Sequence, residues 1–235
     1  MIYIQSNNNL PFHFDSACAL YGAIESYQDY RLVTLDDVLS SKFDSLIRSN
    51  LFIGSVQFMN EVFSRVGLYN VRLPKNSNRV SSVITLGDAY VISKTRKIFI
   101  KPIDIKLFTG LVLDGFIYSC LTSLPESTLV MCYDIFKEEI ESEWRVYVYR
   151  NEITDSRNYS GDFKIGPDYD YIKNIIEENR SDFPSTYTID IGILESGENV
   201  IIEFNDMWAI GNYGIQNGIY LRLLSDRYFD IMKKV

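Results

Sequence analysis

Hydrophobic and polar residues alternate most clearly near the C-terminal end of the chain. Residues 188–194 and 199–204 are β-branched and aliphatic runs, and the tetrapeptide ESGE separates them. Two such runs on either side of a glycine-containing turn predict a two-stranded hairpin. A turn centred on Ser196 and Gly197 then fixes which residues of the two strands face each other.

The predicted register gathers acidic side chains on one face of this hairpin. Counting back from the turn places Asp190 opposite Glu203, and Asn205 points to the same face. Asp and Asn are depleted in strands, and burying unpaired carboxylates is costly, so a cation is expected among them. Oxygen ligands of this kind suit Mg²⁺, which usually also binds substrate phosphates. A solvent-facing polar stripe is the alternative interpretation.

Other elements follow from the same patterns. Apolar runs predict strands, and helical spacing, capping residues or proline predict helices. The predicted strands cover residues 2–4, 51–53, 97–102, 111–113, 129–136 and 143–149, and the predicted helices begin near residues 34, 56, 167 and 215. Strict alternation in the strand at 143–149 places Glu143 and Arg145 on one face, where they either form an ion pair or line a cleft.

Composition narrows the possible functions. The 235-residue chain can form one large or two small domains, and 46% hydrophobic residues suffice for a packed core. A net charge of −8 disfavours a nucleic-acid-binding surface, although residues 94–106 could form a local basic groove for phosphate. His13 is the single histidine, which argues against a histidine-rich zinc site, and a structural or surface role suits it best.

The three cysteines and the hydropathy profile predict a cytoplasmic protein. Cys18, Cys120 and Cys132 are odd in number and lack metal-ligand spacing, which favours a reducing compartment. No apolar run approaches the roughly 18 residues of a membrane span, and residues 1–10 lack the pattern of a signal peptide. We therefore expect no membrane partner and no export.

A lysine stands at the end of one predicted strand and precedes a loop closed by glycine. The strand ends in Lys101-Pro102, the loop ends at Gly110, and a further strand follows. A backbone of this kind can fold over phosphates, with lysine supplying positive charge. The GxxxxGK[ST] sequence of a P-loop is absent. A lysine and proline at a strand end are also common without any ligand.

The order of these segments resembles the ATP-grasp superfamily of ATP-dependent carboxylate–amine ligases. IFIKP, a glycine-closed loop, an apolar strand, SEWRVYV, TIDIGIL and IIEFND follow one another over about 110 residues. The resemblance covers residues 50–230 and is strongest to small ATP-grasp proteins of phages and bacteria. It implies an α+β fold of antiparallel sheets with packed helices, preceded by a small α/β region. The implied division is 1–80 for the N-terminal region and 81–235 for the ATP-grasp region.

The resemblance also assigns roles to single residues, grouped as ATP-binding, catalytic and metal-binding. ATP would be bound by Lys101 at its phosphates, by the backbone of Met131, Cys132 and Tyr133 at the adenine, and by Glu143 at the ribose. Arg145 would face the transferred phosphate, with Lys106 beside it, and Asp190, Glu203 and Asn205 would bind Mg²⁺. The hairpin pattern indicates the same three metal ligands without reference to the family.

Two features depart from the family pattern. Longer members carry a further nucleotide-binding lysine upstream of the KP strand, and Lys75, Lys94 and Lys97 are all candidates here. The large glycine-rich loop of those enzymes is reduced to the single Gly110. The sequence leaves open which lysine contacts ATP and how the phosphates are enclosed.

The implied reaction is amide or peptide bond formation from a carboxylate and an amine. ATP would phosphorylate the carboxylate, and the amine would then displace phosphate from the acyl-phosphate intermediate. The substrates would be small molecules or peptides, with residues 161–170 and 211–214 as candidate substrate loops. An ATP-binding phosphotransferase or ATPase without an amine acceptor is one alternative. A non-catalytic interaction protein that keeps only the fold is another.

Overall fold

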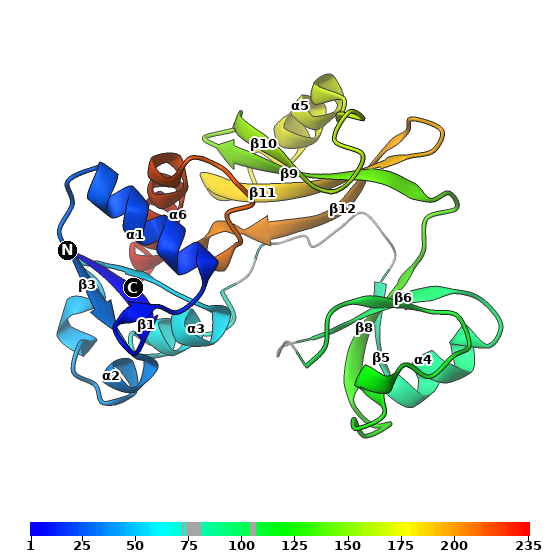
Figure 1. Cartoon of the computed structure of the whole chain (residues 1–235), viewed down its shortest axis with the longest axis horizontal. Helices are drawn as coiled ribbons and strands as arrows, with labels where there is room; N and C mark the ends of the chain where they lie inside the picture. The colour runs from blue at the N-terminus through cyan, green and yellow to red at the C-terminus, as the bar shows by residue number, and fades with distance from the viewer. Residues whose placement is uncertain (72, 74–80, 104–106) are drawn as a thin grey trace. The chain divides into compact units, whose positions relative to one another are not determined.

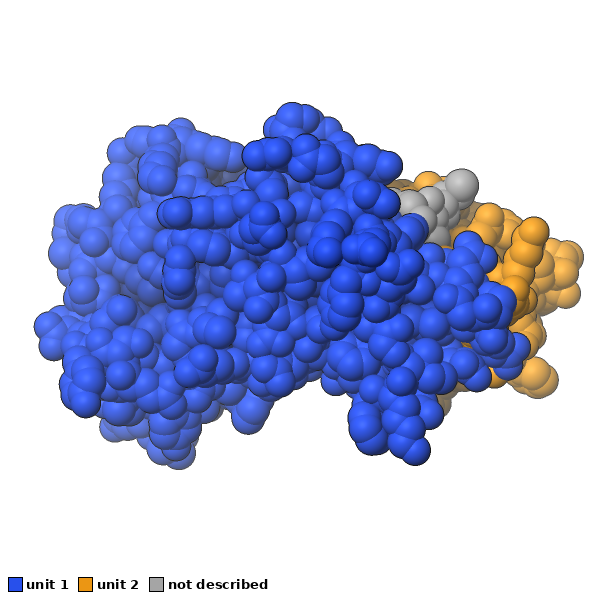
Figure 2. Space-filling view, turned by 90° about the horizontal axis from the view of Figure 1, so that it is seen from above, with its two compact units in different colours: residues 1–77, 141–235 blue, residues 78–140 orange. Residues whose placement is uncertain are grey.

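The computed structural model describes residues 1–71, 73, 81–103 and 107–235. The chain forms two compact units, which Figure 2 draws in different colours. Unit 1 contains Met1–Ser77 and Glu141–Val235, and unit 2 contains Asn78–Ile140. Unit 1 thus combines both ends of the chain. The predicted division at residue 80 stays a prediction, because compactness does not decide where a family domain begins.

The N-terminal part of unit 1 is a small α/β sheet, as predicted. Strand β1 pairs in parallel with β3 and β4 and antiparallel with the short β2. The strands are β1 (Ile2–Asn7), β2 (Leu10–Pro11), β3 (Tyr30–Val33) and β4 (Leu51–Ile53), and the helices are α1 (Phe14–Glu25), α2 (Leu35–Leu39), a 3₁₀ turn η1 (Asp44–Leu46) and α3 (Val56–Ser64). The predicted helix starts are confirmed, since Thr34 and Ser55 accept backbone N–H bonds as N-caps.

The second sheet of unit 1 has the strand order β10-β9-β11-β12. Its strands are β9 (Ile140–Tyr149), β10 (Glu152–Gly161), β11 (Thr186–Leu194) and β12 (Asn199–Asp206), followed by a 3₁₀ turn η3 (Met207–Ala209); the helices are α5 (Tyr169–Glu178) and α6 (Asn217–Met232). Helix α6 lies beside α1 (Figure 1). A bidentate pair between Arg227 of α6 and Asp206 of β12 joins the helix to this sheet.

Alternation along β9 and β11 determines which face of the second sheet carries polar groups. Val146 and Val148 of β9 form a buried cluster with Ile189 and Ile191 of β11 and with the apolar side of α5. Because side chains alternate along a strand, Arg145 and Asp190 point to the opposite face. Helix α5 therefore covers the apolar face and leaves these polar side chains away from it.

The β11–β12 hairpin has the predicted partners but a different turn. Asp190 pairs with Glu203, whereas Ile191 pairs with Ile201, so β12 contains a bulge. At the turn, the Leu194 N–H donates to the Glu198 carbonyl at 2.9 Å, which leaves three residues in the loop. Gly197 adopts a left-handed φ of 84°, as the last residue of such a loop requires. The assumption of a constant register is wrong, but the bulge offsets the shorter strand pairing at the turn.

Unit 2 is an antiparallel sheet with one helix. The strand order is β5-β8-β6-β7. The elements are β5 (Ser81–Thr85), α4 (Leu86–Ser93), β6 (Ile98–Pro102), β7 (Leu111–Leu113), a 3₁₀ turn η2 (Ser119–Leu121) and β8 (Leu129–Asp134). Leu86 and Ala89 of α4 pack on Ile98 and Ile100 of β6. Together, the antiparallel sheets and packed helices of both units confirm the predicted α+β fold.

No helix in the described part of the chain is long and apolar enough to cross a membrane. The predicted cytoplasmic location remains a prediction.

The three cysteines differ in exposure, which predicts selective labelling. Cys120 is exposed, whereas Cys18 and Cys132 are buried, and burial raises the pKa of both buried thiols. Because the thiolate is the reactive form, we expect Cys120 to react at least about tenfold faster with a thiol reagent in the native protein. Mass spectrometry of the labelled chain would identify the site, with Cys120→Ser as the control. Equally fast labelling of Cys18 would contradict this assignment.

Candidate functional site

A buried ion pair lies at the centre of the polar face of the second sheet. Arg145 of β9 donates from Nε to Asp190 Oδ1 at 2.8 Å and from Nη2 to Oδ2 at 2.7 Å. The two residues are 5% and 2% exposed. The cation expected beside Asp190 is thus a guanidinium, held in the bidentate geometry that gives the strongest ionic hydrogen bonds.

Burial and charge act in opposite directions on this pair. Burial alone would lower the pKa of Arg145, but the hydrogen bonds and charge of Asp190 outweigh it and raise the pKa. Burial raises the pKa of Asp190, and the guanidinium opposes this effect. Removing either partner would leave an uncompensated charge in a site with little access to water.

The two other predicted metal ligands lie beside Asp190 on the neighbouring strand. Glu203 is the direct cross-strand partner of Asp190, and Asn205 follows two residues later on the same face. The Asn205 amide nitrogen donates to Asp190 Oδ2 at 3.1 Å. This contact directs the amide nitrogen toward Asp190, so the amide oxygen is the atom of Asn205 that could bind a cation.

The donor set fits Mg²⁺ in part. Glu203 offers carboxylate oxygens and Asn205 an amide oxygen, which are the hard ligands that Mg²⁺ prefers. Both oxygens of Asp190 already accept hydrogen bonds from Arg145. No group of three or more His, Cys, Asp or Glu side chains with metal-binding geometry occurs among the described residues. Asp190 fits as a third ligand only if Arg145 releases one of its oxygens.

Two stacked tyrosines cover the guanidinium. The Tyr213 ring lies 4.4 Å from Arg145 Cζ, and the Tyr159 ring lies 5.9 Å from it. The two rings stack with centroids 5.0 Å apart. The Tyr159 hydroxyl donates to Glu143 Oε2 at 2.7 Å. An ion pair between Glu143 and Arg145 was one expectation from the sequence, and it is wrong: Arg145 pairs with Asp190, and Glu143 accepts from Tyr159. The ribose-binding role of Glu143 stays a prediction.

The loop that carries Tyr213 is held by side chains from three elements. The Tyr147 hydroxyl of β9 donates to the carbonyls of Gly211 and Asn212 at 3.0 and 2.5 Å. Asp15, in the first turn of α1, accepts from the Asn212 N–H at 2.7 Å. Tyr220 of α6 donates to the Ile210 carbonyl at 2.5 Å. The loop predicted to face the substrate is therefore anchored to the N-terminal region as well as to the sheet.

In unit 2 the predicted ATP-binding residues lie on strands β6 and β8. Lys101 pairs with Met131 across the sheet, and its ammonium lies 5.3 Å from the Tyr133 ring centroid. These three side chains share the face away from α4. Cys132 points to the opposite face, where it belongs to the cluster around α4. A contact between Cys132 and adenine through its backbone, as the resemblance implies, does not depend on this side-chain direction.

Two predicted lysines lie outside the described residues. Lys106, the second predicted catalytic residue, is one of them, and Lys75 is the other. Lys94 caps the C-terminal end of α4, and Lys97 is exposed just before β6. Which upstream lysine contacts ATP stays open.

The sequence did not indicate Tyr159, Tyr213 or Asp15 as parts of this site. Tyr159 is the extra residue of a bulge in β10, where the register shifts between Asn158 and Ser160. A count from the turn would have placed Tyr159 opposite Ser142 instead of beside Glu143. Asp15 lies far from Asn212 in sequence, and no local pattern signals their contact.

Comparison with known proteins agrees with this geometry. A family model described as an ATP-grasp domain, the second family of its clade, matches residues 78–223, which is more than half of the chain. The search of curated proteins gave no match. Residues 78–223 include strands of both units, so the family domain is not confined to one of them.

Solved structures with the same fold are ligases. D-alanine–D-alanine ligase from Bacillus anthracis is 9% identical, with 99% of this chain and 98% of that chain covered and a TM-score of 0.55. N5-carboxyaminoimidazole ribonucleotide synthetase from Thermotoga maritima is 11% identical, with coverage of 96% and 75% and a TM-score of 0.56. The ATP-grasp ligase PsnB, bound to a minimal precursor, is 9% identical, with coverage of 96% and 98% and a TM-score of 0.51. At these identities the likeness concerns the fold alone, and the family match carries the assignment: the chain belongs to the ATP-grasp domain family whose model it matches.

Proposed function

We propose that this protein is an ATP- and Mg²⁺-dependent ligase that joins a carboxylate to an amine through an acyl-phosphate. The observation that carries the proposal is the buried Arg145–Asp190 pair with Glu203 and Asn205 beside it on β12. A packed apolar face would stabilise the fold as well or better, so a charged cluster of this kind is better explained by chemistry. The family membership makes ATP the natural phosphate donor.

Each named side chain then has a separate task. Lys101 would neutralise phosphate charge, and backbone groups of Met131–Tyr133 would bind the adenine. Mg²⁺, when bound at Glu203 and Asn205, would bridge phosphate oxygens and withdraw negative charge from them. Arg145 would stabilise the phosphate as it transfers to the substrate carboxylate. Because catalysis rests on positioning and charge, no histidine or cysteine nucleophile is required.

The carboxylate and amine substrates would be small molecules or peptides. The solved structures with this fold include a complex of PsnB with a precursor peptide and a D-alanine–D-alanine ligase, so both substrate sizes occur in the fold. The anchored loop with Tyr213 lies next to Arg145, which makes it the best-placed element to contact the carboxylate.

Binding of ATP with Mg²⁺ should stabilise the full chain against heat. At 100 times its dissociation constant, a ligand stabilises by about 2.7 kcal/mol, which corresponds to a shift of roughly 5–11 °C for a chain of this size. Differential scanning fluorimetry with and without nucleotide and metal measures the shift. Lys101→Met should reduce it because a phosphate contact is lost.

Lys164→Met is the matched control, since Lys164 is exposed on a loop of unit 1 and has no proposed role. Its shift should equal that of the wild type. A wild-type melting temperature unmoved by ATP, with or without Mg²⁺, would leave only the third possibility, a non-catalytic interaction protein.

Amine dependence separates ligation from the other ATP-consuming reactions. If the protein is a ligase, ADP release should rise when a pool of amines accompanies a pool of carboxylates. A phosphotransferase would release ADP with an acceptor alone, and an ATPase would need neither. Coupled-enzyme detection of ADP, with each pool omitted in turn, distinguishes the three.

A further inference from the structure

A groove on unit 2 runs along α4, on the side of its sheet away from Lys101. Its volume is about 610 Å³, within the range of small-ligand sites. Its lining from α4 includes Gly87, Tyr90, Val91 and Lys94, which recur at helical spacing on one face. The opposite face of the helix packs on β6, so this face is turned away from the proposed nucleotide residues.

The far wall of the groove is the segment that leads into β8. The Gly87 N–H donates to the Glu126 carbonyl at 3.0 Å. A β-carbon on Gly87 would lie only 3.3 Å from the β-carbon of Glu126, so glycine permits this close approach. The Glu126 side chain is thereby held beside the first turn of α4.

Opposite charges stand at the two ends of the groove. Lys94 lies at the C-terminal end of α4 and Glu126 beside the N-terminal end. Within the described residues, neither side chain has a hydrogen bond or an ion pair. The other carboxylate of the groove, Asp88, already accepts from the Thr85 hydroxyl at 2.7 Å. One ammonium and one carboxylate are therefore available to a ligand.

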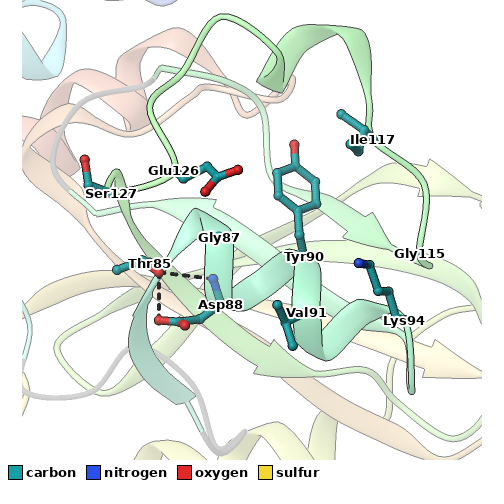
Figure 3. Close-up of a pocket in the computed structure, with 10 residues that line it drawn as sticks. All are labelled: Thr85, Gly87, Asp88, Tyr90, Val91, Lys94, Gly115, Ile117, Glu126 and Ser127. Atoms are coloured by element: carbon teal, nitrogen blue, oxygen red, sulfur yellow. Dashed lines mark hydrogen bonds between the residues drawn. The ribbon is translucent and has the colours of Figure 1, made fainter.

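The middle of the groove is apolar and contains a hydroxyl that lacks a partner. Val91 and Ile117 are 64% and 66% exposed, although both are large hydrophobic residues. Tyr90 points between Glu126 and Ile117 (Figure 3). Its hydroxyl is buried and has no hydrogen-bond partner in the described part of the chain. Buried hydroxyls usually have a partner, so this one points to a missing group.

The spacing of the charges sets the length of a matching ligand. Seven residues of α-helix separate Gly87 from Lys94, a rise of about 10.5 Å. An extended peptide spans at most about 3.3–3.6 Å per residue, so three residues cover this distance. From this charge and length complementarity we infer that the groove binds a short peptide of about three residues, its free amino end at Glu126 and its free carboxylate at Lys94. The central apolar side chain would lie on Val91 and Ile117.

Titration of the ¹⁵N-labelled full chain with Ala-Leu-Ala, without nucleotide, tests this inference. Saturable amide shifts are expected in residues 85–94 and 115–127. Because exposed charge pairs contribute little, Lys94→Met and Glu126→Gln should each weaken binding about two- to fivefold. Lys137→Met and Glu139→Gln are exposed charge changes in unit 2 outside the groove and should leave binding unchanged.

Blocked peptides determine whether the two ends bind as inferred. An N-acetylated peptide should bind equally to the wild type and to Glu126→Gln, because the ammonium that Glu126 recognises is gone. A C-amidated peptide should likewise be insensitive to Lys94→Met. The inference is overturned if no saturable shifts occur, or if the free and doubly blocked peptides bind alike. Either result leaves the ligase proposal untouched, since the groove uses none of its residues.

Discussion

Asp190→Ala is expected to destabilise unit 1 by about 3–5 kcal/mol, because it leaves the Arg145 guanidinium buried without a counter-charge. The bidentate contact and the low exposure of both residues place this pair among buried ion pairs. Both tryptophans of the chain, Trp144 and Trp208, belong to unit 1. Urea unfolding followed by tryptophan fluorescence therefore reports the stability of this unit.

A double-mutant cycle isolates the interaction between the two charges. Arg145→Met alone should also destabilise, whereas the double variant with Asp190→Ala should cost much less than the sum, since no buried charge remains. The control is Glu177→Ala, which removes the partner of Arg180 in an exposed pair on α5. That change should cost no more than about 1 kcal/mol. If Asp190→Ala were as mild as Glu177→Ala, the pair would not be the buried, dry contact described above.

The sequence was most informative where polar residues interrupt a regular strand. Alternation along β9 placed Arg145 on the correct face, and the pairing of Asp190 with Glu203 is confirmed. The second result depended on two deviations that cancel, a three-residue turn and a bulge in β12. Bulges follow from the twist of a particular sheet and leave no mark on the local sequence, so the agreement at Asp190 could not have been guaranteed.

Two helices escaped prediction because each contains a glycine. Gly22 of α1 meets α6 so closely that a β-carbon would lie 2.5 Å from the Asn217 carbonyl oxygen. Gly87 of α4 makes a close, though less tight, approach to Glu126. Glycine in a helical segment normally lowers helix propensity by about 1 kcal/mol. Here tertiary packing favours the small residue, and a single sequence does not distinguish this requirement from a helix breaker.

The partner of Arg145 shows why the site was only partly predictable. Residue types and faces indicated a cluster of charges, but not which charges pair. Arg145 has Glu143 two residues away on its own strand and Asp190 on the adjacent strand β11. Two oxygens at hydrogen-bond distance favour Asp190, since a guanidinium binds best to a carboxylate that meets both of its donors. Tyr159 then takes Glu143, through a bulge that the sequence does not reveal.

Glu203→Ala should abolish the Mg²⁺-dependent part of the activity while leaving the fold intact. The carboxylate is only partly buried, so its removal leaves no isolated buried charge, unlike Asp190→Ala. A bound metal contributes several kcal/mol to stabilising transition-state charge, and each 1.36 kcal/mol is tenfold in rate. Mg²⁺-dependent ATP consumption should therefore fall by more than about a hundredfold. The urea midpoint of the variant should stay close to that of the wild type.

Glu198→Ala is the matched control, because Glu198 lies in the exposed turn of the same hairpin. It should retain full Mg²⁺-dependent turnover and the full metal-dependent part of the ATP melting shift. Glu203→Ala should lose that part and keep any shift that ATP causes without metal, since Lys101 is unchanged. Unaltered ATP consumption by folded Glu203→Ala would refute a metal-binding role for this carboxylate. The cluster around Asp190 would then have to be explained by the Arg145 ion pair alone, and the ligase proposal would lose the observation on which it rests.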